Sequence, residues 1–548
     1  MPAPDMQSFV KELESRGWLK RITAEVDPVL EITEIYDRVV KTGGPALLFT
    51  RPKGSDIPVL INTYGSRERM CLALGAESLE EIAERVQQLV KPEIPTTLLE
   101  KLKKIPQLMQ LGSLPPKIVR RGICQEIVRK DDADLTALPA LKCWPLDGDL
   151  SRNAYSHVRE LGRRAPGAGR AAATPGDARR TGAENEGSEH ARWTMDESAA
   201  PAAEPSMLLP PANEGRYLTL TNVFTKHPDT GERNIGMYRV QILGQKLAAM
   251  HWHMHHDGAR HFRRYRELGR RMPIAVALGG PSVMPYAATC PLPPGIDECL
   301  FAGFLNGGSI ELVACVTQPE IEVPATAEIV VEGYIDPLEP PVVEGPFGDH
   351  TGFYSLADLY PRLHVTAITH RKDPIYPTTV VGKPPQEDFW LGKATERIFL
   401  PLLRTIIPDI IDYNLPMFGC FHNCAFVKIR KEYPYQARRV MSAIWGTGQM
   451  AFTKMIVVVD EHVDVQNEQA VLFALCANCD PKRDTLIIEG PLDILDHAAP
   501  VCGVGGKIGF DATRKIAGEG PVRAWPDEIE MSAEMRAQVT RRWREYGF

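Results

Sequence analysis

The feature that most constrains the fold of this 548-residue chain is an abrupt change of composition between Leu150 and Glu214. This segment is rich in Ala, Gly, Pro, Glu and Arg and has few bulky apolar residues, as in RRAPGAGRAAATPGDARRTGAENEGSE. Such a segment cannot bury enough apolar surface to offset the entropy lost on ordering, so we expect it to be disordered. The hydrophobic cores must therefore form from the residues on either side, as two or three domains.

The overall composition is that of a globular protein. Apolar residues make up 44% of the chain and charged residues 24%, and no stretch approaches the roughly 18 apolar residues of a membrane span. A net charge of -7 argues against nucleic acid as the main partner, because phosphate binding needs a basic surface. No secretory signal is visible at the N-terminus, and the eleven cysteines form no dense framework, so we expect a cytoplasmic protein with reduced thiols.

Apolar periodicity divides the remaining chain into three regions. Residues 6–50 have the spacing of helix, strand, helix and strand, and helical spacing returns from 78 to 109, before a Pro-rich boundary near Pro115. Alternation typical of strands runs from Tyr217 to about Tyr334, and the last third alternates helices with strands. These patterns predict an α/β (α+β) protein with several domains.

The stretch EGPFGDHTGFY carries two acids, Glu344 and Asp349, on either side of a Gly-Pro-Phe-Gly turn. Glycine and proline favour a tight loop that holds the two carboxyl groups near one another. Neighbouring acids do not both ionise freely, so we expect one of them to stay protonated as a proton donor. From the residues alone, a catalytic pair, a metal-binding loop and a solvated turn all remain open.

The stretch NIGMYRVQ places Asn234 and Arg239 on a predicted strand. A guanidinium group presented from a rigid strand suits bidentate docking of a substrate carboxylate. The competing interpretation is an ordinary surface or ion-pair arginine.

Five histidines lie in HWHMHHDGARH, residues 251–261, and Glu298 follows in GIDECLFAGF. Histidine nitrogen, a carboxylate and the Asn234 amide together suit a divalent ion such as Mn²⁺ or Mg²⁺. Alternation puts the first, third and fifth residues of HWHMHH on one face and the sixth on the other. Only part of the cluster can therefore meet one ion.

With these motifs, the sequence resembles the UbiD family of prenylated-flavin decarboxylases. The stretches LEITEIYDRVVKTGGPALLF, NIGMYR, VPATAEIVVEGYI, EGPFGDHTGFY and GGKIGFDATRK are similar to family signatures and stand in the family's order. The resemblance covers nearly the whole chain outside the Ala/Gly/Pro segment.

The resemblance implies a catalytic set of Arg239, Glu344 and Asp349. Arg239 would orient the substrate carboxylate, Glu344 would protonate the carbon after CO₂ leaves, and Asp349 would tune both through hydrogen bonds. Loss of CO₂ from an sp² carbon leaves an electron pair without an adjacent sink, and a prenylated FMN cofactor would supply that sink.

The family's metal ligands fall on Asn234, His255 and Glu298, although a one-residue slip would choose His256 instead. The implied ion is Mn²⁺ or Mg²⁺, with a K⁺ ion nearby, between the cofactor phosphate and the protein. The residues implied to bind the flavin are Thr219, Arg239, His255, Cys290, Pro291, Gln449 and Thr453.

By resemblance, an N-terminal α/β domain spans residues 1–118. A flavin-reductase-like split β-barrel spans 119–332, with an inserted loop at about 150–214, and a C-terminal α/β oligomerisation domain spans 333–548. We interpret the insertion as a loop that acts as a lid or as a partner contact.

The resemblance also implies an aromatic or α,β-unsaturated acid as the substrate. The sequence is similar to 4-hydroxy-3-polyprenylbenzoate decarboxylases of ubiquinone synthesis and to naphthoate decarboxylases of the futalosine route to menaquinone. A flavin prenyltransferase of the UbiX family would supply the cofactor, the chain would form a dimer or hexamer, and a lipophilic substrate would bring it to a membrane surface. A catalytically inactive flavin-binding relative and a metal-dependent hydrolase are the alternatives.

Overall fold

The structure is a computed structural model. It describes residues 1–90, 114–151, 214–253, 256–293, 295–520 and 523–548. Most of the segment that we expected to be disordered lies outside these residues, and so does the end of the helical spacing expected up to residue 109. Among the described helices, none combines the length and the apolar character needed to cross a membrane.

The N-terminal region is a helix-covered sheet, as its periodicity predicted. Its elements are α1 (Met6–Ser15), β1 (Leu19–Val26), α2 (Glu31–Val40), β2 (Ala46–Pro52), β3 (Val59–Ile61), α3 (Arg67–Leu74) and α4 (Leu79–Val90). Helix α1 begins where the Asp5 side chain accepts a hydrogen bond from the Ser8 backbone amide at 2.7 Å. Its buried face is the apolar face seen in the sequence, so the pattern predicted both the helix and its orientation.

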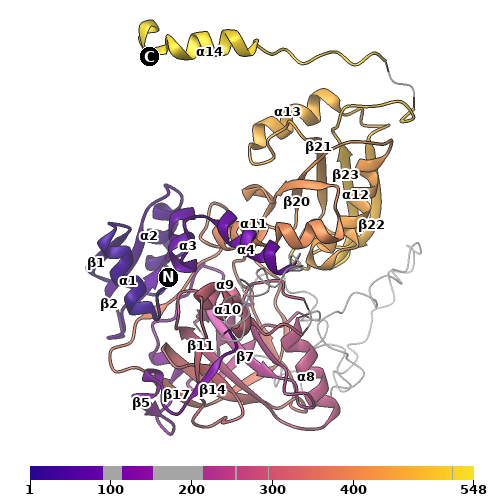
Figure 1. Cartoon of the computed structure of the whole chain (residues 1–548). Coiled ribbons are helices and arrows are strands. Elements are labelled where there is room, and N and C mark those ends of the chain that lie inside the picture. The colour runs from indigo at the N-terminus through magenta and orange to yellow at the C-terminus, as the bar shows by residue number, and fades with distance from the viewer. Residues whose placement is uncertain (91–113, 152–213, 254–255, 294, 521–522) are drawn as a thin grey trace, which may run out of the picture.

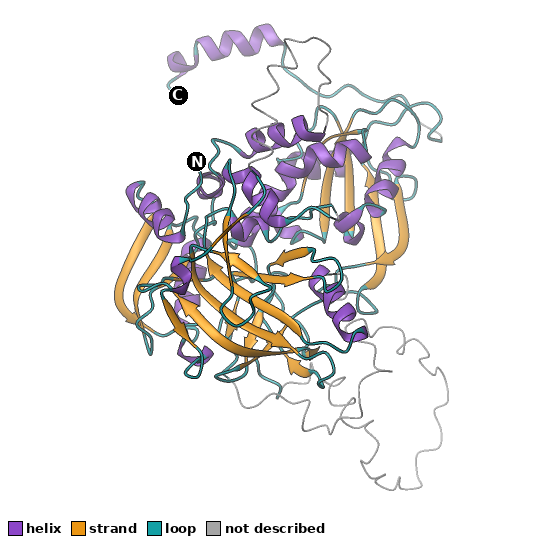
Figure 2. Ribbon diagram, turned by 60° about the horizontal axis from the view of Figure 1, so that its bottom comes forward, coloured by secondary structure: helices purple, strands orange, loops and turns teal. Residues whose placement is uncertain are grey.

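The middle of the chain forms an entirely antiparallel sheet of nine strands that curves into a half-barrel (Figure 2). Its strands are β5 (Ile127–Arg129), β6 (Tyr217–Leu218), β7 (Thr221–Lys226), β8 (Arg233–Gly236), β9 (Val240–Ile242), β10 (Leu247–Met250), β11 (Met272–Gly279), β14 (Ala327–Ile335) and β17 (Arg362–His370). Every residue of β11, MPIAVALG, is buried between its neighbours β7 and β14. The predicted β-rich middle domain is therefore confirmed.

Smaller elements surround this half-barrel. They are β4 (Lys117–Val119), β12 (Glu311–Ala314) and β13 (Glu322–Pro324) in a second sheet, β15 (Val342–Glu344) with β16 (Asp358–Tyr360), and helices α8 (Asp257–Glu267), α9 (Met284–Ala287) and α10 (Glu298–Asn306). The strand pair β15–β16 carries the EGPFGDHTGFY loop between its two strands.

The half-barrel extends beyond residue 332, where we expected the middle domain to end. Strand β14 runs through that position, and β17 pairs with β14 from Ile329 to Ile335. The apolar alternation stops near Tyr334, but its partner strand returns only after the EGPFGDHTGFY loop. The loop is therefore held inside the half-barrel domain and is not the start of the next one.

The N-terminal and middle regions share a sheet. Strand β18 (Tyr376–Pro377) pairs in parallel with β3, at the edge of the order β1-β2-β3-β18. The buried carboxylate of Glu387 reinforces this junction, because it accepts hydrogen bonds from the backbone amides of Asn62 and Tyr64 at 3.2 and 2.7 Å.

The C-terminal region is a second α/β unit with a mixed five-stranded sheet in the order β19-β20-β21-β23-β22 (Figure 1). Its elements are α11 (Asp388–Ile406), β19 (Ile410–Asn414), β20 (Cys424–Ile429), α12 (Gln436–Trp445), β21 (Met455–Asp460), α13 (Glu468–Asn478), β22 (Thr485–Pro491), β23 (Val504–Asp511) and α14 (Ala533–Arg541). The helices and strands predicted in the last third of the chain are confirmed, because each follows from local periodicity. The predicted three-part α/β organisation is confirmed as well.

Candidate active site

Arg239 stands at the centre of a buried polar cluster in the half-barrel. It lies in the short connection between β8 and β9, directly before β9, whereas alternation had placed it inside one continuous strand with Asn234. The break in the strand turns its side chain toward the EGPFGDHTGFY loop. Only 8% of the Arg239 side chain is exposed.

Both acids of the loop bind this guanidinium group. Glu344 accepts hydrogen bonds from Nε and Nη2 at 2.8 and 3.0 Å, a bidentate pair, and Asp349 accepts one from Nη1 at 2.6 Å. Ser355 accepts another from Nη2 at 3.0 Å, and the Phe347 ring lies 4.7 Å from the guanidinium carbon. The predicted proximity of the two acids is therefore present, with the arginine between them.

This arrangement limits how Arg239 can bind a substrate. A guanidinium group has five N–H donors, and Glu344, Asp349 and Ser355 take four of them. One N–H, on Nη1, remains for another ligand. The expected bidentate docking of a substrate carboxylate does not fit this geometry, because Glu344 occupies the bidentate face.

The arginine also keeps both acids ionised. Burial raises the pKa of Glu344, but the Arg239 charge and a hydrogen bond from His251 outweigh it and bring the pKa to about 2. Burial likewise opposes ionisation of Asp349, yet the His350 hydrogen bond and the Arg239 charge hold its pKa well below the usual range. The expectation that one acid stays protonated is thus wrong, because a cation between two carboxylates removes their repulsion.

The two acids differ in their access to solvent. The Glu344 side chain has no exposed surface, whereas that of Asp349 is 10% exposed. Asp349 Oδ1 accepts hydrogen bonds from the backbone amide of His350 at 2.9 Å and from its ring Nδ1 at 3.1 Å. Burial lowers the pKa of His350, but the hydrogen bond to Asp349 and the nearby acid Asp388 raise it to about 9. His350 is therefore a cation at neutral pH.

Part of the histidine cluster serves Glu344. The His251 ring donates through Nδ1 to Glu344 Oε2 at 2.9 Å, and its Nε2 lies 2.7 Å from Nε2 of His253. Burial and the Arg239 charge lower the pKa of His251, so the ring is neutral and its Nε2 accepts the His253 proton. Alternation had correctly placed these two histidines on one face, but nothing in the sequence pointed to Glu344 as the partner of His251.

The predicted metal ligands are only partly within the described residues. Asn234 lies in β8, and Glu298 is the first residue of α10, where its Oε2 accepts a hydrogen bond from the Ile235 amide at 3.0 Å. His255 lies outside the described residues. His256 instead precedes α8, and its Nδ1 accepts a hydrogen bond from the His253 amide at 3.1 Å.

Asn234 and Glu298 lie near one another, because the Glu298 carboxylate binds the amide of Ile235, the residue after Asn234. The buried Asn234 side-chain nitrogen has no hydrogen-bond partner in the part of the chain that the structure describes. Burial raises the pKa of Glu298 to about 8, although two backbone amides oppose the change. A divalent cation would satisfy the buried Glu298 carboxylate, and the Asn234 side-chain oxygen could serve as a second ligand. Within the described ranges, no three His, Cys, Asp or Glu side chains gather closely enough to hold a metal ion.

The remaining predicted cofactor residues lie in two regions. Thr219 follows β6 and donates its hydroxyl to the Thr379 carbonyl at 2.6 Å, so its hydrogen is already committed. Cys290 follows α9 and directs its thiol to the Tyr286 carbonyl at 3.3 Å, and Pro291 comes next in the chain. Gln449 and Thr453 lie at and just beyond a 3₁₀ turn, Gly448–Phe452, of the C-terminal region.

Thr453 differs from Thr219 in having an unused hydroxyl. Its buried Oγ1 has no hydrogen-bond partner among the described residues. Of the predicted residues, the structure thus brings Arg239, Glu344 and Asp349 into one cluster. Arg239 is itself one of the implied flavin-binding residues, but among the described residues no hydrogen bond joins Thr219, Cys290, Gln449 or Thr453 to the cluster.

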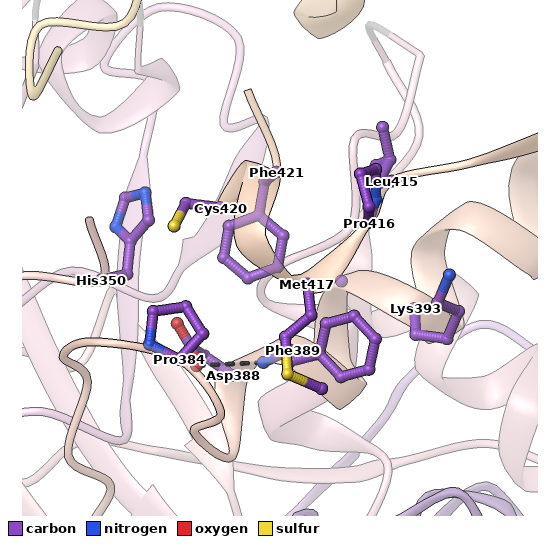
Figure 3. A pocket seen from close by; sticks show the side chains of 11 residues that line it. His350, Pro384, Asp388, Phe389, Lys393, Leu415, Pro416, Met417, Cys420 and Phe421 are labelled. Carbon is purple, nitrogen blue, oxygen red and sulfur yellow. Dashed lines mark hydrogen bonds between the residues drawn. The ribbon is translucent and has the colours of Figure 1, made fainter. Parts of the chain in front are cut away.

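A small, partly open pocket adjoins this cluster, between the half-barrel and the C-terminal region (Figure 3). Its volume is about 10 Å³, and its lining residues are His350, Pro384, Asp388, Phe389, Gly392, Lys393, Leu415, Pro416, Met417, Cys420 and Phe421. His350 belongs to both the cluster and the pocket, because it binds Asp349 through Nδ1 and lines this space. Asp388 lines the same space, and burial raises its pKa to about 6.

The pocket wall at Phe421 has an unusual backbone. Cys420 and Phe421 both have positive φ angles, 43° and 67°, although neither is glycine. Such conformations are costly and concentrate at functional sites. The Phe421 ring packs so close to α11 that a Cβ on Gly392 would lie 2.1 Å from it.

Sequence reasoning did not single out His350, Asp388 or Phe421. His350 lies within the quoted motif and could have been found as the only basic residue beside Asp349. The other two have no local signal, since they reach the site from other elements.

Comparison with known proteins agrees with this fold. The family models of 3-octaprenyl-4-hydroxybenzoate carboxy-lyase match the chain with their N-terminal domain at 10–113, their Rift-related domain at 202–384 and their C-terminal domain at 389–512. These matches define a carboxy-lyase. The chain belongs to the UbiD family and is a decarboxylase.

An uncharacterized protein of Aquifex aeolicus is 45% identical over 545 residues, which cover 99% of this chain and 98% of that protein. The closed form of the vanillic acid decarboxylase of Sedimentibacter hydroxybenzoicus superposes with a TM-score of 0.75 over 99% of both chains, at 23% identity. The UbiD-class enzyme HmfF of Pelotomaculum thermopropionicum, solved with FMN, gives a TM-score of 0.68 at 25% identity, over 95% of this chain and 97% of its own.

Proposed function

We propose that this chain removes CO₂, reversibly and without net oxidation, from a compact aromatic carboxylic acid with the help of prenylated FMN. The observation that carries the proposal is the buried cluster in which Arg239 binds the ionised Glu344 and Asp349. Asp349 is also hydrogen-bonded to His350, which lines the neighbouring pocket. HmfF has been solved with FMN, and an evolved dimeric form of it with prenylated FMN.

The residues present fit a flavin phosphate and its ion. Glu298 offers a buried carboxyl group and the neighbouring Asn234 a side-chain oxygen, which suit Mn²⁺ or Mg²⁺. The unpartnered Thr453 hydroxyl is a further donor on the side of the C-terminal region. When bound, the flavin would accept the electron pair that remains on the substrate when CO₂ departs.

Arg239 would bind the substrate carboxylate through its one uncommitted N–H and through its charge. This single contact positions the carboxylate without holding it as firmly as a bidentate pair would. A weaker hold on the ground state favours departure of CO₂, because interactions that stabilise only the substrate do not speed the reaction.

We assign the proton donor to Asp349 and not, as the resemblance first suggested, to Glu344. Glu344 has no exposed surface and is bound by Arg239 and His251, so its carboxylate cannot reach a substrate atom. Asp349 is partly exposed and contacts the pocket-lining His350. A substrate carboxylate near Arg239 would weaken the hold of the guanidinium charge on Asp349 and so raise its pKa.

His350 would supply the proton. It is cationic at neutral pH and already donates its Nδ1–H to Asp349, so a short transfer from Nδ1 to Oδ1 gives the neutral acid. Asp349 then protonates the ring carbon that has lost CO₂, and His350 regains a proton from solvent after product release. In the reverse reaction the same groups would remove the ring proton.

The pocket favours a compact substrate. A space of about 10 Å³ holds about one water molecule, so a ring enters only if Phe421 and its loop move aside. Of the two quinone-pathway substrates that the resemblance implies, we favour the naphthoate, because it has no prenyl tail for the protein to accommodate. The aromatic rings of Phe389 and Phe421 would pack on it.

The proposal includes a flavin prenyltransferase of the UbiX family as supplier of the cofactor. It also includes self-association as a dimer or hexamer through the C-terminal region, and K⁺ as a second ion. These follow from the family resemblance.

The test is anaerobic co-production with a flavin prenyltransferase, followed by mass spectrometry of the released small molecules. CO₂ release is then measured on benzoates and naphthoates, and on a polyprenylbenzoate. We expect prenylated FMN in the protein and turnover of compact aromatic acids. Asp349→Asn should retain the flavin and lose turnover, and an exposed change, Asp56→Asn, is the matched control. Folded protein that binds prenylated FMN but decarboxylates no aromatic acid would contradict the proposal.

A further inference from the structure

A tight turn far away in sequence touches the loop that carries Asp349. This turn, residues 143–148 with the sequence CWPLDG, precedes the inserted segment. Asp147 is buried, with 1% of its surface exposed, and its Oδ1 accepts a hydrogen bond from the backbone amide of Gly348 at 2.8 Å. Its Oδ2 accepts one from the Trp144 amide at 2.8 Å. One carboxylate therefore joins the turn to the residue before Asp349.

A second contact fixes the same two segments. The Gly148 amide donates to the Pro346 carbonyl at 2.9 Å, within the Gly-Pro-Phe-Gly part of the loop. The Leu146 amide donates to the Tyr354 hydroxyl at 3.1 Å, at the other end of the loop. Backbone of the turn thus holds the loop before and after Asp349.

Trp144 lies between this loop and the one that leads to the pocket. A Cβ on Gly348 would lie 2.1 Å from the indole Cδ1, and one on Gly382 would lie 2.7 Å from Cζ2. The indole Nε1 donates to the Val381 carbonyl at 2.9 Å. Three residues further on, Pro384 lines the pocket. Both loops have glycine where the indole touches them, so the ring fits closely between them.

We propose that Asp147 and Trp144 are positioning residues for decarboxylation: they set the distance between the acid Asp349 and the pocket wall at Pro384. The inference rests on the proposed role of Asp349 as the proton donor. Neither residue touches the substrate. They act through the backbone of Gly348 and Val381, and a misplacement of reacting groups by about 1 Å can cost on the order of 10²-fold in rate.

The test is Asp147→Asn. The amide keeps the size of the side chain but turns one of its two acceptors into a donor, which then faces a backbone amide. Burial raises the pKa of Asp147 to about 7, so assays at pH 8 compare the ionised wild type with the variant. Trp144→Phe removes the Nε1 donor and part of the ring. Asp134→Asn is the matched control, because Asp134 also accepts a backbone amide, that of Thr136, within its own turn.

Two measurements distinguish a positioning role of Asp147 and Trp144 from a general role in folding, and distinguish a failure of this inference from a failure of the proposed function. In hydrogen–deuterium exchange of the protein without substrate, Asp147→Asn should expose the amides of residues 344–349, while the control leaves them unchanged. In the flavin-loaded enzyme, Asp147→Asn should lower kcat on the order of 10²-fold with less than about a threefold change in KM, and Trp144→Phe about tenfold.

Faster exchange with wild-type kcat would overturn the inference, and so would unchanged exchange. If kcat falls only as the share of folded, flavin-loaded protein falls, the residues are merely structural and the inference is wrong. A wild-type enzyme that is folded and loaded but inactive on every aromatic acid would instead count against the proposed function.

Discussion

Replacement of Glu344 by glutamine tests whether the buried cluster is ionised. Arg239 and His251 lower the pKa of Glu344 from 4.5 to about 2 against the effect of burial. A tenfold change in an acid constant is worth about 1.4 kcal/mol, so this decrease stabilises the folded protein by about 3 kcal/mol at neutral pH. The value agrees with the cost of about 3–5 kcal/mol for breaking a buried ion pair.

The sign of the pH dependence follows from the lowered pKa. The stabilisation is fully present above the unfolded value of 4.5 and disappears as the pH falls from there toward 2. We expect the wild type to exceed Glu344→Gln by about 3 kcal/mol in the free energy of unfolding at pH 7. At pH 3 the folded-state carboxylate is still largely ionised, so the difference should shrink by about 2 kcal/mol and should not vanish.

The assay is urea unfolding of both proteins at each pH from 7 to 3, followed by fluorescence. Glu34→Gln is the control, because Glu34 pairs with Arg38 on the surface of α2 and 60% of its side chain is exposed. Such a pair contributes less than about 1 kcal/mol, so the control should follow the wild type. A difference between wild type and Glu344→Gln that stays constant from pH 7 to pH 3 would refute the ionised cluster.

Three further outcomes are expected. NMR titration of histidine-labelled protein, with His350→Gln to assign the signal, should place the pKa of His350 near 9, and Asp388→Asn should lower it; an unchanged value would rule out Asp388 as its partner. Gly392→Ala should displace the Phe421 ring and alter kcat/KM more for naphthoates than for benzoates, and equal effects would place that ring away from the substrate. Glu298→Gln should lose most of the bound Mn²⁺, measured by elemental analysis of purified protein, whereas retention of the metal would remove Glu298 from the proposed ligands.

Much of the fold could be predicted because it is encoded locally. Helix α11, of 19 residues, and strand β21, of 6 residues, can each be predicted from the apolar periodicity of their own sequence. The boundary at residue 332 could not be read in this way, since β14 pairs with a strand that returns only at Arg362. Partners separated by a long loop leave no local pattern.

The residues of the site could be predicted from the sequence, but their hydrogen bonds and their exposure to solvent could not. Motif order pointed to Arg239, Glu344 and Asp349, and the structure gathers all three. The sequence could not show that Arg239 uses four of its donors inside the protein, because its partners lie 105 to 116 residues away. Nor could it show that Glu344 has no exposed surface, although this decides which acid can reach a substrate.

The shared sheet of the N-terminal and middle regions has a consequence for how this chain can be divided. Strand β3 is not an edge strand of the N-terminal sheet, because β18, more than three hundred residues later, pairs with it. A fragment cut before the half-barrel would expose a row of unpaired backbone groups, a template for aggregation. The same fragment would leave the amides of Asn62 and Tyr64 without the Glu387 carboxylate. The sheet of the first ninety residues is therefore complete only after β18 has been synthesised. Gene fusions or truncations that separate these residues from the half-barrel region should yield insoluble protein.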